Sequence, residues 1–200
     1  LTFTGNYTIN SYTLLYLVDG IEHQRLTIEF GTSITPEAAL EKEGHTFSGW
    51  SEIPNYMPAS DVTITGTFTI NSYTLTYVLD GTTFHTGSVV FGTMITAPEV
   101  PVKEGHTFNG WTDVPAKMPA KDVTITGGYT INRYILTYTI DGVEYKKFEW
   151  DYGTSITAEA KPTKEGHTFN GWNGEPATMP ANNVTVTGTF IANIYNVTYI

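Results

Sequence analysis

The sequence predicts a mostly β protein, α+β at most, built as a tandem array of three small modules. Three observations support this prediction. The same motif residues recur every 61 positions along the 200-residue chain. Within each copy, short segments alternate between apolar and polar residues, which is the pattern of half-buried strands. The composition is also rich in residues that favour strands, with 35 threonines, 13 tyrosines, 10 phenylalanines and 4 tryptophans.

The repeat frame follows from residues that recur without any insertion. By our count, 26 of the 61 positions are identical in all three copies. The predicted modules are residues 12–72, 73–133 and 134–194. Residues 1–11 are expected to be the tail strand of an upstream repeat, and residues 195–200 the start of the next one. A unit of this length can hold a small core of its own, unlike the thinner coils of a solenoid.

The first half of the middle copy predicts a hairpin. Residues 73–79 alternate between apolar and polar, and Asp80-Gly81 follows as a pair typical of tight hairpin turns. A second, less regular strand is expected at residues 84–91, pairing with the first. Residues 97–103 contain two prolines, which argues against a long helix in this connector.

The second half of the copy predicts two further strands. Residues 106–111 form a short strand that should bulge at Gly110, and residues 118–122 a turn or a single helical turn. Residues 123–131 show the most regular alternation. The apolar phase then slips by one residue at Asn132-Arg133, which turns the inward face over as a strand enters the next module. Junctions this short, without flexible Gly/Ser-rich linkers, predict an extended rod.

The segment from Lys103 to Trp111, followed by Met118-Pro119-Ala120 and Asp122-Val123-Thr124, resembles the Listeria–Bacteroides repeat. This is the B-repeat of internalin-type bacterial surface proteins. The opening at residues 73–77 and the ending at residues 129–132 match as well, and the resemblance recurs in all three copies.

The resemblance implies a small β-grasp-like sheet in each module. It also implies an extracellular place, at the bacterial cell surface or in a secreted protein, among tandem modules that often lie beyond a ligand-binding domain. Two features depart from the family pattern. His45, His106 and His167 stand where the family usually has Tyr, and the stretch between the repeated Trp and Met is shorter than in internalins. The shorter stretch argues against a helix or extra strand there.

The repeated aromatic, methionine and glycine residues are assigned a structural role. A tryptophan that is identical in every copy is more often part of a core than a sugar-binding platform. Each repeated Trp is therefore expected to be mostly buried against the Met of its own module. The structural repeat motif comprises Trp50, Trp111, Trp172, Phe47, Phe108, Phe169, Met57, Met118, Met179, Gly49, Gly110 and Gly171. Trp150 occurs only in the third copy, where the others have Ile28 and Val89, and is expected to fill the same pocket.

The composition excludes several chemistries. The chain has no cysteine, so disulfides, thiolate metal sites and cysteine nucleophiles are excluded. A net charge of −10 argues against nucleic acids and anionic membranes as partners. The apolar runs are too short to span a bilayer, so no membrane insertion is expected. No complete polar site can be assembled, so we assign no catalytic, cofactor-binding or metal-binding residue and expect no enzyme.

Three weaker hypotheses stay open. One His and one Glu in each copy make an incomplete metal site, which a neighbouring module would have to complete. The repeated Asp-Gly pairs are primarily turns, with a weak calcium site as the alternative. A repeated Lys and Asn in each copy suggest an intramolecular isopeptide bond. These residues are Lys42, Lys103, Lys164, Asn71, Asn132 and Asn193.

The identical positions are mostly Gly, Pro, large apolar and turn residues, whereas the second strand varies between copies. This pattern predicts non-catalytic stalk repeats that present another domain away from a bacterial surface. The alternative is an adhesion module that recognises a host protein or glycan through the variable second strand or inter-module grooves. The chain is expected to be a monomer without a cofactor.

Overall fold

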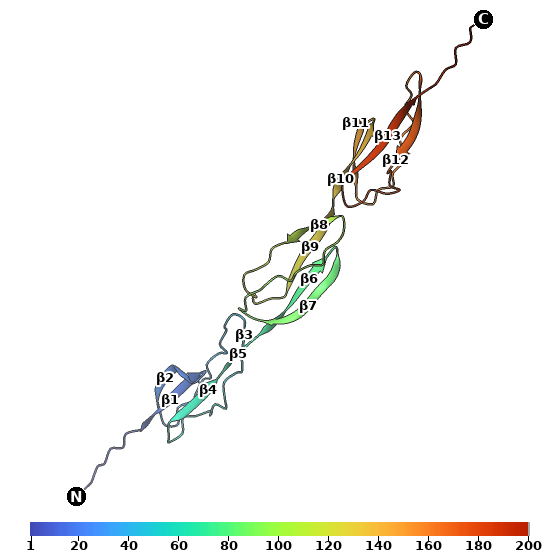
Figure 1. Ribbon diagram of the computed structural model, residues 1–200. Helices are drawn as coiled ribbons and strands as arrows, with labels where there is room; N and C mark the ends of the chain where they lie inside the picture. The colour runs from blue at the N-terminus through green and yellow to red at the C-terminus, as the bar shows by residue number, and fades with distance from the viewer. Residues whose placement is uncertain (200) are drawn as a thin grey trace. The chain divides into compact units, whose positions relative to one another are not determined.

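The computed structural model describes residues 1–199, and its regular elements are all strands, with no helix in that part of the chain (Figure 1). The same strand pattern recurs in each copy, which confirms the prediction of a mostly β repeat array. Residues 1–10 and 193–199 contain no strand. The predicted start of a next repeat, residues 195–200, ends at Ile200, which lies outside the described residues.

Each repeat contributes a hairpin followed by two or three further strands. The first repeat contains β1 (Ser11–Val18), β2 (Ile21–Glu29), β3 (His45–Phe47), β4 (Val62–Gly66) and β5 (Phe68–Ile70). The middle repeat contains β6 (Ser72–Leu79), β7 (Thr82–Val90), β8 (His106–Trp111) and β9 (Val123–Ile131). The third repeat contains β10 (Arg133–Ile140), β11 (Val143–Asp151), β12 (His167–Asn173) and β13 (Val184–Ala192).

The sheets share one mixed topology. The strand orders are β2-β1-β4 with a separate β3-β5 pair, β7-β6-β9-β8, and β11-β10-β13-β12. The hairpins are antiparallel, whereas the first and last long strands of a repeat run parallel, with Leu14 opposite Val62 and Leu136 opposite Val184. This mixed sheet is the β-grasp-like module implied by the resemblance, here without a helix. The variable strands β2, β7 and β11 lie at sheet edges.

The chain divides into two compact units, and the division runs through the middle repeat. The first unit comprises residues 1–78, 83–96 and 113–125, and the second comprises residues 79–82, 97–112 and 126 onward. In the first unit, alternate residues of β1 point inward, and the buried cluster consists of Leu14, Tyr16, Ile34, Met57 and Ile64. The equivalent cluster of the second unit consists of Leu136, Tyr138, Met179 and Val186. Burying each such side chain contributes about 1.5–3 kcal/mol.

The local backbone agrees with three of the sequence predictions. The pairing of β8 with β9 shifts register between Phe108 and Trp111, and Gly110 has φ of +94°, which confirms the bulge. Asp80 and Gly81 have φ of +48° and +78°, the two left-handed residues of a type I′ hairpin turn. The connector at residues 97–103 has no helix.

The single helical turn considered for residues 118–122 does not form. The backbone of Met118 is bonded on both sides to a distant segment, accepting from Gly92 N at 2.8 Å and donating to Thr93 O at 2.8 Å. These ladder-like bonds use the groups that a helical turn would need. A bend at residues 120–121 then leads into β9.

Candidate functional site

The repeated tryptophan is half-buried, and not mostly buried as its identity in every copy predicted. Trp50 packs against the buried cluster that contains Met57, and Trp172 against the cluster that contains Met179. The indole N–H of each Trp donates to a carbonyl of the proline-containing connector. The acceptors are Ala38 O for Trp50 at 3.2 Å, Pro98 O for Trp111 at 3.0 Å and Glu159 O for Trp172 at 3.0 Å. Each Trp thus ties its connector to the sheet.

The other motif residues are a buried methionine, a phenylalanine that contacts the Trp, and a glycine of the bulge. Met57, Met118 and Met179 are 1%, 1% and 0% exposed. In each repeat the motif Phe meets the Trp edge-on, with ring centroids 5.0, 5.3 and 4.8 Å apart. The motif glycines Gly49, Gly110 and Gly171 have φ between +83° and +98°, as the bulge requires. The arrangement is that of a packed core without an open reactive group.

A further glycine, outside the predicted structural motif, lies against these rings. A Cβ placed on Gly127 would lie 2.7 Å from the Trp111 ring and 2.9 Å from the Phe108 ring. Gly66 and Gly188 have the same relationship to the Phe and Trp of their own repeats. The signal in the sequence is that this glycine is identical in all three copies within an otherwise regular strand, where glycine is unfavourable.

The metal and acid–base hypotheses find no geometry to support them. The Nδ1 atoms of His45, His106 and His167 lie 2.8 Å from the backbone carbonyls of Glu43, Glu104 and Glu165, not from their carboxylates. Among residues 1–199, no group of three or more His, Asp or Glu side chains could hold a metal ion. The repeated turn aspartates instead accept backbone N–H groups 49 residues further along the chain.

The isopeptide hypothesis meets competing contacts. The Nζ atoms of Lys42, Lys103 and Lys164 lie 5.2–5.5 Å from the centroids of Phe68, Tyr129 and Phe190. Each junction asparagine accepts a hydrogen bond at its Oδ1 from a threonine. The donors are Thr46 for Asn71, Thr107 for Asn132 and Thr168 for Asn193, at 2.7–2.8 Å. The amino and amide groups that would have to react are therefore engaged with other partners.

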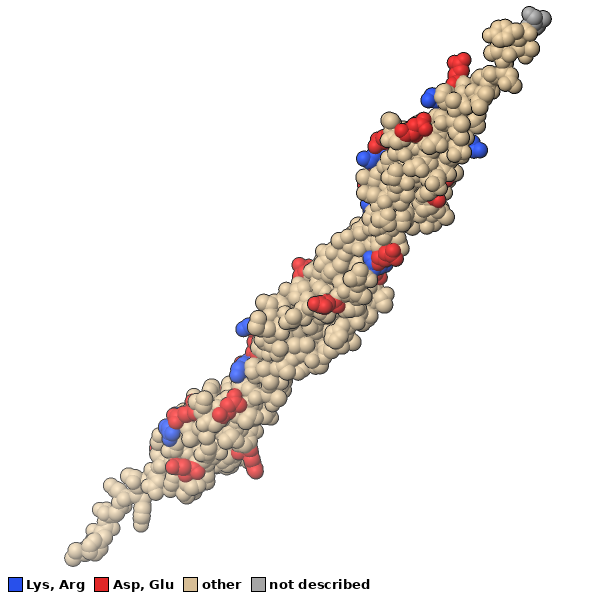
Figure 2. Space-filling model, in the orientation of Figure 1, with Lys and Arg blue, Asp and Glu red and all other residues tan. Residues whose placement is uncertain are grey.

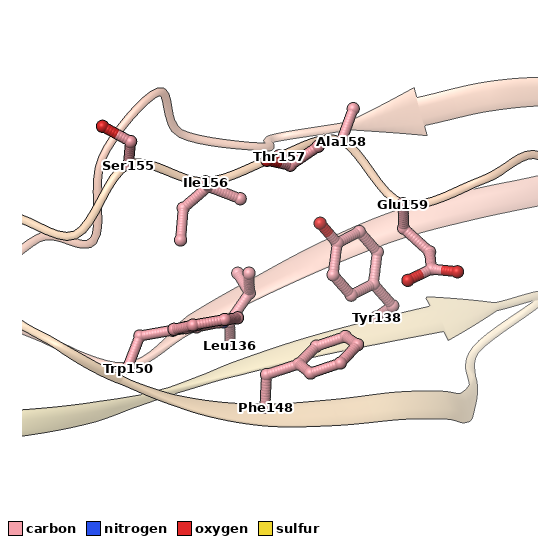
Figure 3. Close-up of a pocket in the computed structure, with 9 residues that line it drawn as sticks. All are labelled: Leu136, Tyr138, Phe148, Trp150, Ser155, Ile156, Thr157, Ala158 and Glu159. Atoms are coloured by element: carbon pink, nitrogen blue, oxygen red, sulfur yellow. The ribbon is translucent and has the colours of Figure 1, made fainter.

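The third repeat has a cavity of about 290 Å³ beside its hairpin (Figure 3). Its lining residues are Leu136, Tyr138, Phe148, Trp150, Ser155, Ile156, Thr157, Ala158 and Glu159. The expectation that Trp150 fills the pocket of Ile28 is wrong. Ile28 packs against the core of the first repeat, but Trp150 is 39% exposed and stacks on Phe148 with centroids 6.2 Å apart. Phe148 already covers the core in the third repeat, so Trp150 lies at the cavity rim.

The polar groups of the cavity include the hydroxyl of Tyr138. The hydroxyl of Tyr138 donates to Glu175, and burial together with this bond raises the pKa of Tyr138 far above its ordinary value. A phenol of that kind neither accepts nor releases a proton near neutral pH. The remaining lining is apolar apart from Ser155, Thr157 and Glu159. The cavity is thus an aromatic surface feature of one repeat.

The surface carries few charges. On the face shown in Figure 2, Lys and Arg side chains are scattered singly among more numerous Asp and Glu side chains, without a basic patch. Within the described residues, the structure contains no helix long and apolar enough to cross a membrane.

Comparison with known proteins identifies the repeat. The model of the Listeria-Bacteroides repeat domain matches three times, at residues 12–71, 73–131 and 134–194. A protein of Evansella cellulosilytica named "Putative membrane protein" is 30% identical over 198 residues, covering 86% of this chain and 29% of its own length. Internalin H of Listeria monocytogenes is 36% identical over 124 residues, covering 56% of this chain and 22% of its own length. The chain spans less than a third of the length of these relatives. Both the matches and the repeated sheet lead to one conclusion: the chain belongs to the Listeria-Bacteroides repeat domain family.

Proposed function

We propose that this chain is a set of non-catalytic spacer repeats that hold another domain of a bacterial cell-surface or secreted protein away from the surface. The proposal draws on the family of the chain and on relatives named as an internalin and as a membrane protein. The observation that carries it is the construction of the junctions between repeats.

Each junction consists of a single residue between two strands. β5 ends at Ile70 and β6 begins at Ser72, so only Asn71 links them. The N–H of Asn71 donates to Gly44 O at 2.8 Å, and its carbonyl accepts from Phe91 N at 2.9 Å. The linking residue is thereby bonded to the repeat before it and to the repeat after it.

The junction at Asn132 is built in the same way. Its N–H donates to Gly105 O at 2.8 Å and its carbonyl accepts from Tyr152 N at 2.9 Å. A linker with both backbone groups fixed has little of the conformational freedom of a flexible tether. Such junctions suit a spacer, because a spacer works only if its repeats do not fold back on one another.

The test is to display the chain on a bacterial surface between an anchor and a reporter domain. Deleting residues 73–133 removes one repeat and keeps the period. Replacing residues 134–194 with a second copy of residues 73–133 keeps the length and changes the surface. For a spacer, antibody access to the reporter falls with the deletion and is unchanged by the replacement. The proposal is overturned if the replacement lowers antibody access to the reporter, or if the deletion leaves that access unchanged.

A second candidate function is adhesion through a sheet edge. β2, β7 and β11 all lie at sheet edges, where unpaired backbone groups can accept a strand from a partner. Charged residues protect such edges, and β2 and β11 carry several. β7 (Thr82–Val90) carries no Asp, Glu, Lys or Arg, so it is the edge on which an added strand meets least opposition.

Binding of the chain to arrays of host proteins and glycans tests this second function. Ser88→Lys places a charge at an exposed position of β7, and Thr27→Lys does the same at the equivalent exposed position of β2. Edge binding predicts micromolar binding that Ser88→Lys abolishes and Thr27→Lys leaves intact. Binding that neither variant changes would assign recognition to another surface, and its complete absence would favour the spacer.

A further inference from the structure

Two glycines of the repeated Lys-Glu-Gly-His turn lie directly beneath an aromatic ring of the following repeat. Gly44 is buried under Phe91, and Gly105 is buried under Tyr152. A Cβ on either glycine would overlap ring atoms of its partner. The first contact lies wholly within the first compact unit and the second wholly within the second.

The surroundings of the two contacts are alike. His45 meets Phe91 edge-on with centroids 6.0 Å apart at 74°, and His106 meets Tyr152 with the same distance and angle. The glycine carbonyl and the aromatic N–H are both bonded to the junction asparagine between them. The ring, the glycine, the histidine and the asparagine thus form one closed cluster, called here the clasp.

The same cluster is half-formed at two other places. Phe30 occupies the position of Phe91, and its N–H bonds to Asn10 O at 2.9 Å, but its side chain is 55% exposed. Gly166 occupies the position of Gly105, and its carbonyl accepts from Asn193 N at 2.8 Å, but a Cβ there would meet nothing within 4 Å. An open hollow of about 280 Å³ lies beside Phe30, lined also by Ile9, Asn10 and Tyr12.

We propose that the clasp is the recognition element between successive repeats, and that Phe30 and the Gly166-His167 turn are interaction surfaces for one kind of partner, a further repeat of the same family. Phe30 fits the Gly-His turn of a preceding repeat, and Gly166-His167 fits the Phe or Tyr of a following one. Each half already has one of the two backbone bonds to its junction asparagine, so a further repeat would add the second bond together with the ring-on-glycine contact.

The chemistry of the contact explains its selectivity. The glycine must be free of a side chain because the ring occupies the place of its Cβ, and its φ of +65° to +69° disfavours other residues independently. The partner must be flat to lie over the glycine and meet the histidine edge-on. Because the two ends of a repeat are different and complementary, the interface is head-to-tail and can be repeated along an array. The inference goes beyond the spacer proposal and holds equally for an adhesive array.

The chain contains its own matched control for the test. Gly105 and Gly166 stand in the same sequence, Lys-Glu-Gly-His-Thr-Phe-Asn-Gly-Trp, with φ of +65° and +66°, and differ in having a ring above them. Gly105→Ala adds both backbone strain and a collision with Tyr152, whereas Gly166→Ala adds the strain alone. Amide hydrogen exchange of the full chain reports on Asn132 N–H in the first variant and on Asn193 N–H in the second.

The clasp predicts that Gly105→Ala accelerates exchange at Asn132 at least tenfold more than Gly166→Ala accelerates it at Asn193. Equal effects would overturn the proposal. Tyr152→Ala and Phe30→Ala give a second, milder pair: only Tyr152→Ala should accelerate exchange at its junction asparagine. The pair keeps the test decisive if Gly105→Ala fails to fold.

The interaction surface is tested by lengthening the chain. A copy of residues 73–133 joined after Ile194 keeps the 61-residue period and brings a copy of Phe91 to the position above Gly166. In this longer chain Gly166→Ala should become as damaging as Gly105→Ala, with a matching rise in exchange at Asn193. If Gly166→Ala has the same small effect in both chains, Gly166-His167 is not a surface for a further repeat.

Discussion

The carboxylate of Asp80 accepts a hydrogen bond from the backbone N–H of Tyr129, with Oδ1 and N 3.0 Å apart. Asp80 therefore serves both as a hairpin turn residue and as a clamp on β9 near the end of the repeat. Its other oxygen forms an ion pair with Lys103 at 3.2 Å. The backbone bond, followed by the lysine bond, holds the pKa of Asp80 below its ordinary value.

Acid should weaken the middle repeat through this clamp. Because the folded-state pKa of Asp80 is depressed, its ionised form contributes stability above the unfolded-state pKa, and this contribution is lost as pH falls through the folded-state value, below about pH 4. Asp80→Asn keeps an acceptor oxygen and tolerates the left-handed turn but cannot ionise. We expect the Asp80→Asn variant to be less stable than the parent chain at pH 7. Between pH 5 and pH 2 it should lose less stability than the parent, as measured by urea unfolding.

Asp141→Asn is the control for this prediction. Asp141 makes the same turn and the same backbone bond, to Phe190 N at 3.2 Å, and has no lysine partner among the ion pairs of the described residues. Its effect at pH 7 should be the smaller of the two. An acid dependence of the middle repeat that is unchanged by Asp80→Asn would contradict the prediction.

Removing the repeated Trp111 should destabilise the fold more than removing Trp150, which occurs only in the third copy. Trp111→Ala removes a half-buried ring and a hydrogen bond to Pro98 O, so it should cost about 3 kcal/mol, the lower end of the range for buried aromatic residues. Trp150→Ala removes an exposed ring that stacks on Phe148 and should cost about 1 kcal/mol or less. Hydrogen exchange resolved by repeat measures both, and similar costs would refute the structural assignment.

Alkali should unfold the repeats through their buried tyrosines. Tyr16, Tyr77 and Tyr138 are each 1% exposed, and burial raises the pKa of each. The raised folded-state pKa means that the neutral phenols contribute stability that is present below the unfolded-state pKa of about 10 and lost as pH rises above it. Tyrosine absorbance near 295 nm, followed together with circular dichroism, should show these three ionising only as the strands unfold. Their ionisation in a still-folded chain would be the contrary result.

The dimensions of the chain in solution follow from the sequence prediction of an extended array. By the size scaling of compact domains, 200 residues in one globule would have a radius of gyration of about 16.5 Å. Three modules in line at a spacing of about 30 Å would give about 27 Å by the same scaling. Small-angle scattering at low concentration distinguishes these values, and a value near the lower one would remove the main support for the spacer.

The local elements of the fold were predictable from the sequence. The alternation at residues 123–131 coincides with β9 (Val123–Ile131), and the Asp-Gly pairs form left-handed turns. Strand alternation and positive-φ glycine are properties of a few neighbouring residues, so a local pattern is enough to place them.

Other features depended on residues far apart in the chain. The parallel pairing of Leu14 with Val62, the exposure of Trp150 and the clamp from Asp80 to Tyr129 were not predicted. Each feature depends on which residues of a distant segment the fold brings next to it. Trp150 is exposed because Phe148, two residues earlier, already covers the core of the third repeat.

The sequence by itself determined the 61-residue period, the strands and turns within each copy, and the family of the chain. The tertiary structure decided what each repeated residue does. Gly105 and Gly166 are indistinguishable in sequence and in backbone angle, yet only Gly105 is covered by an aromatic ring. The ring comes from Tyr152, 47 residues further along, and no local pattern records which distant side chain will occupy the space above a glycine.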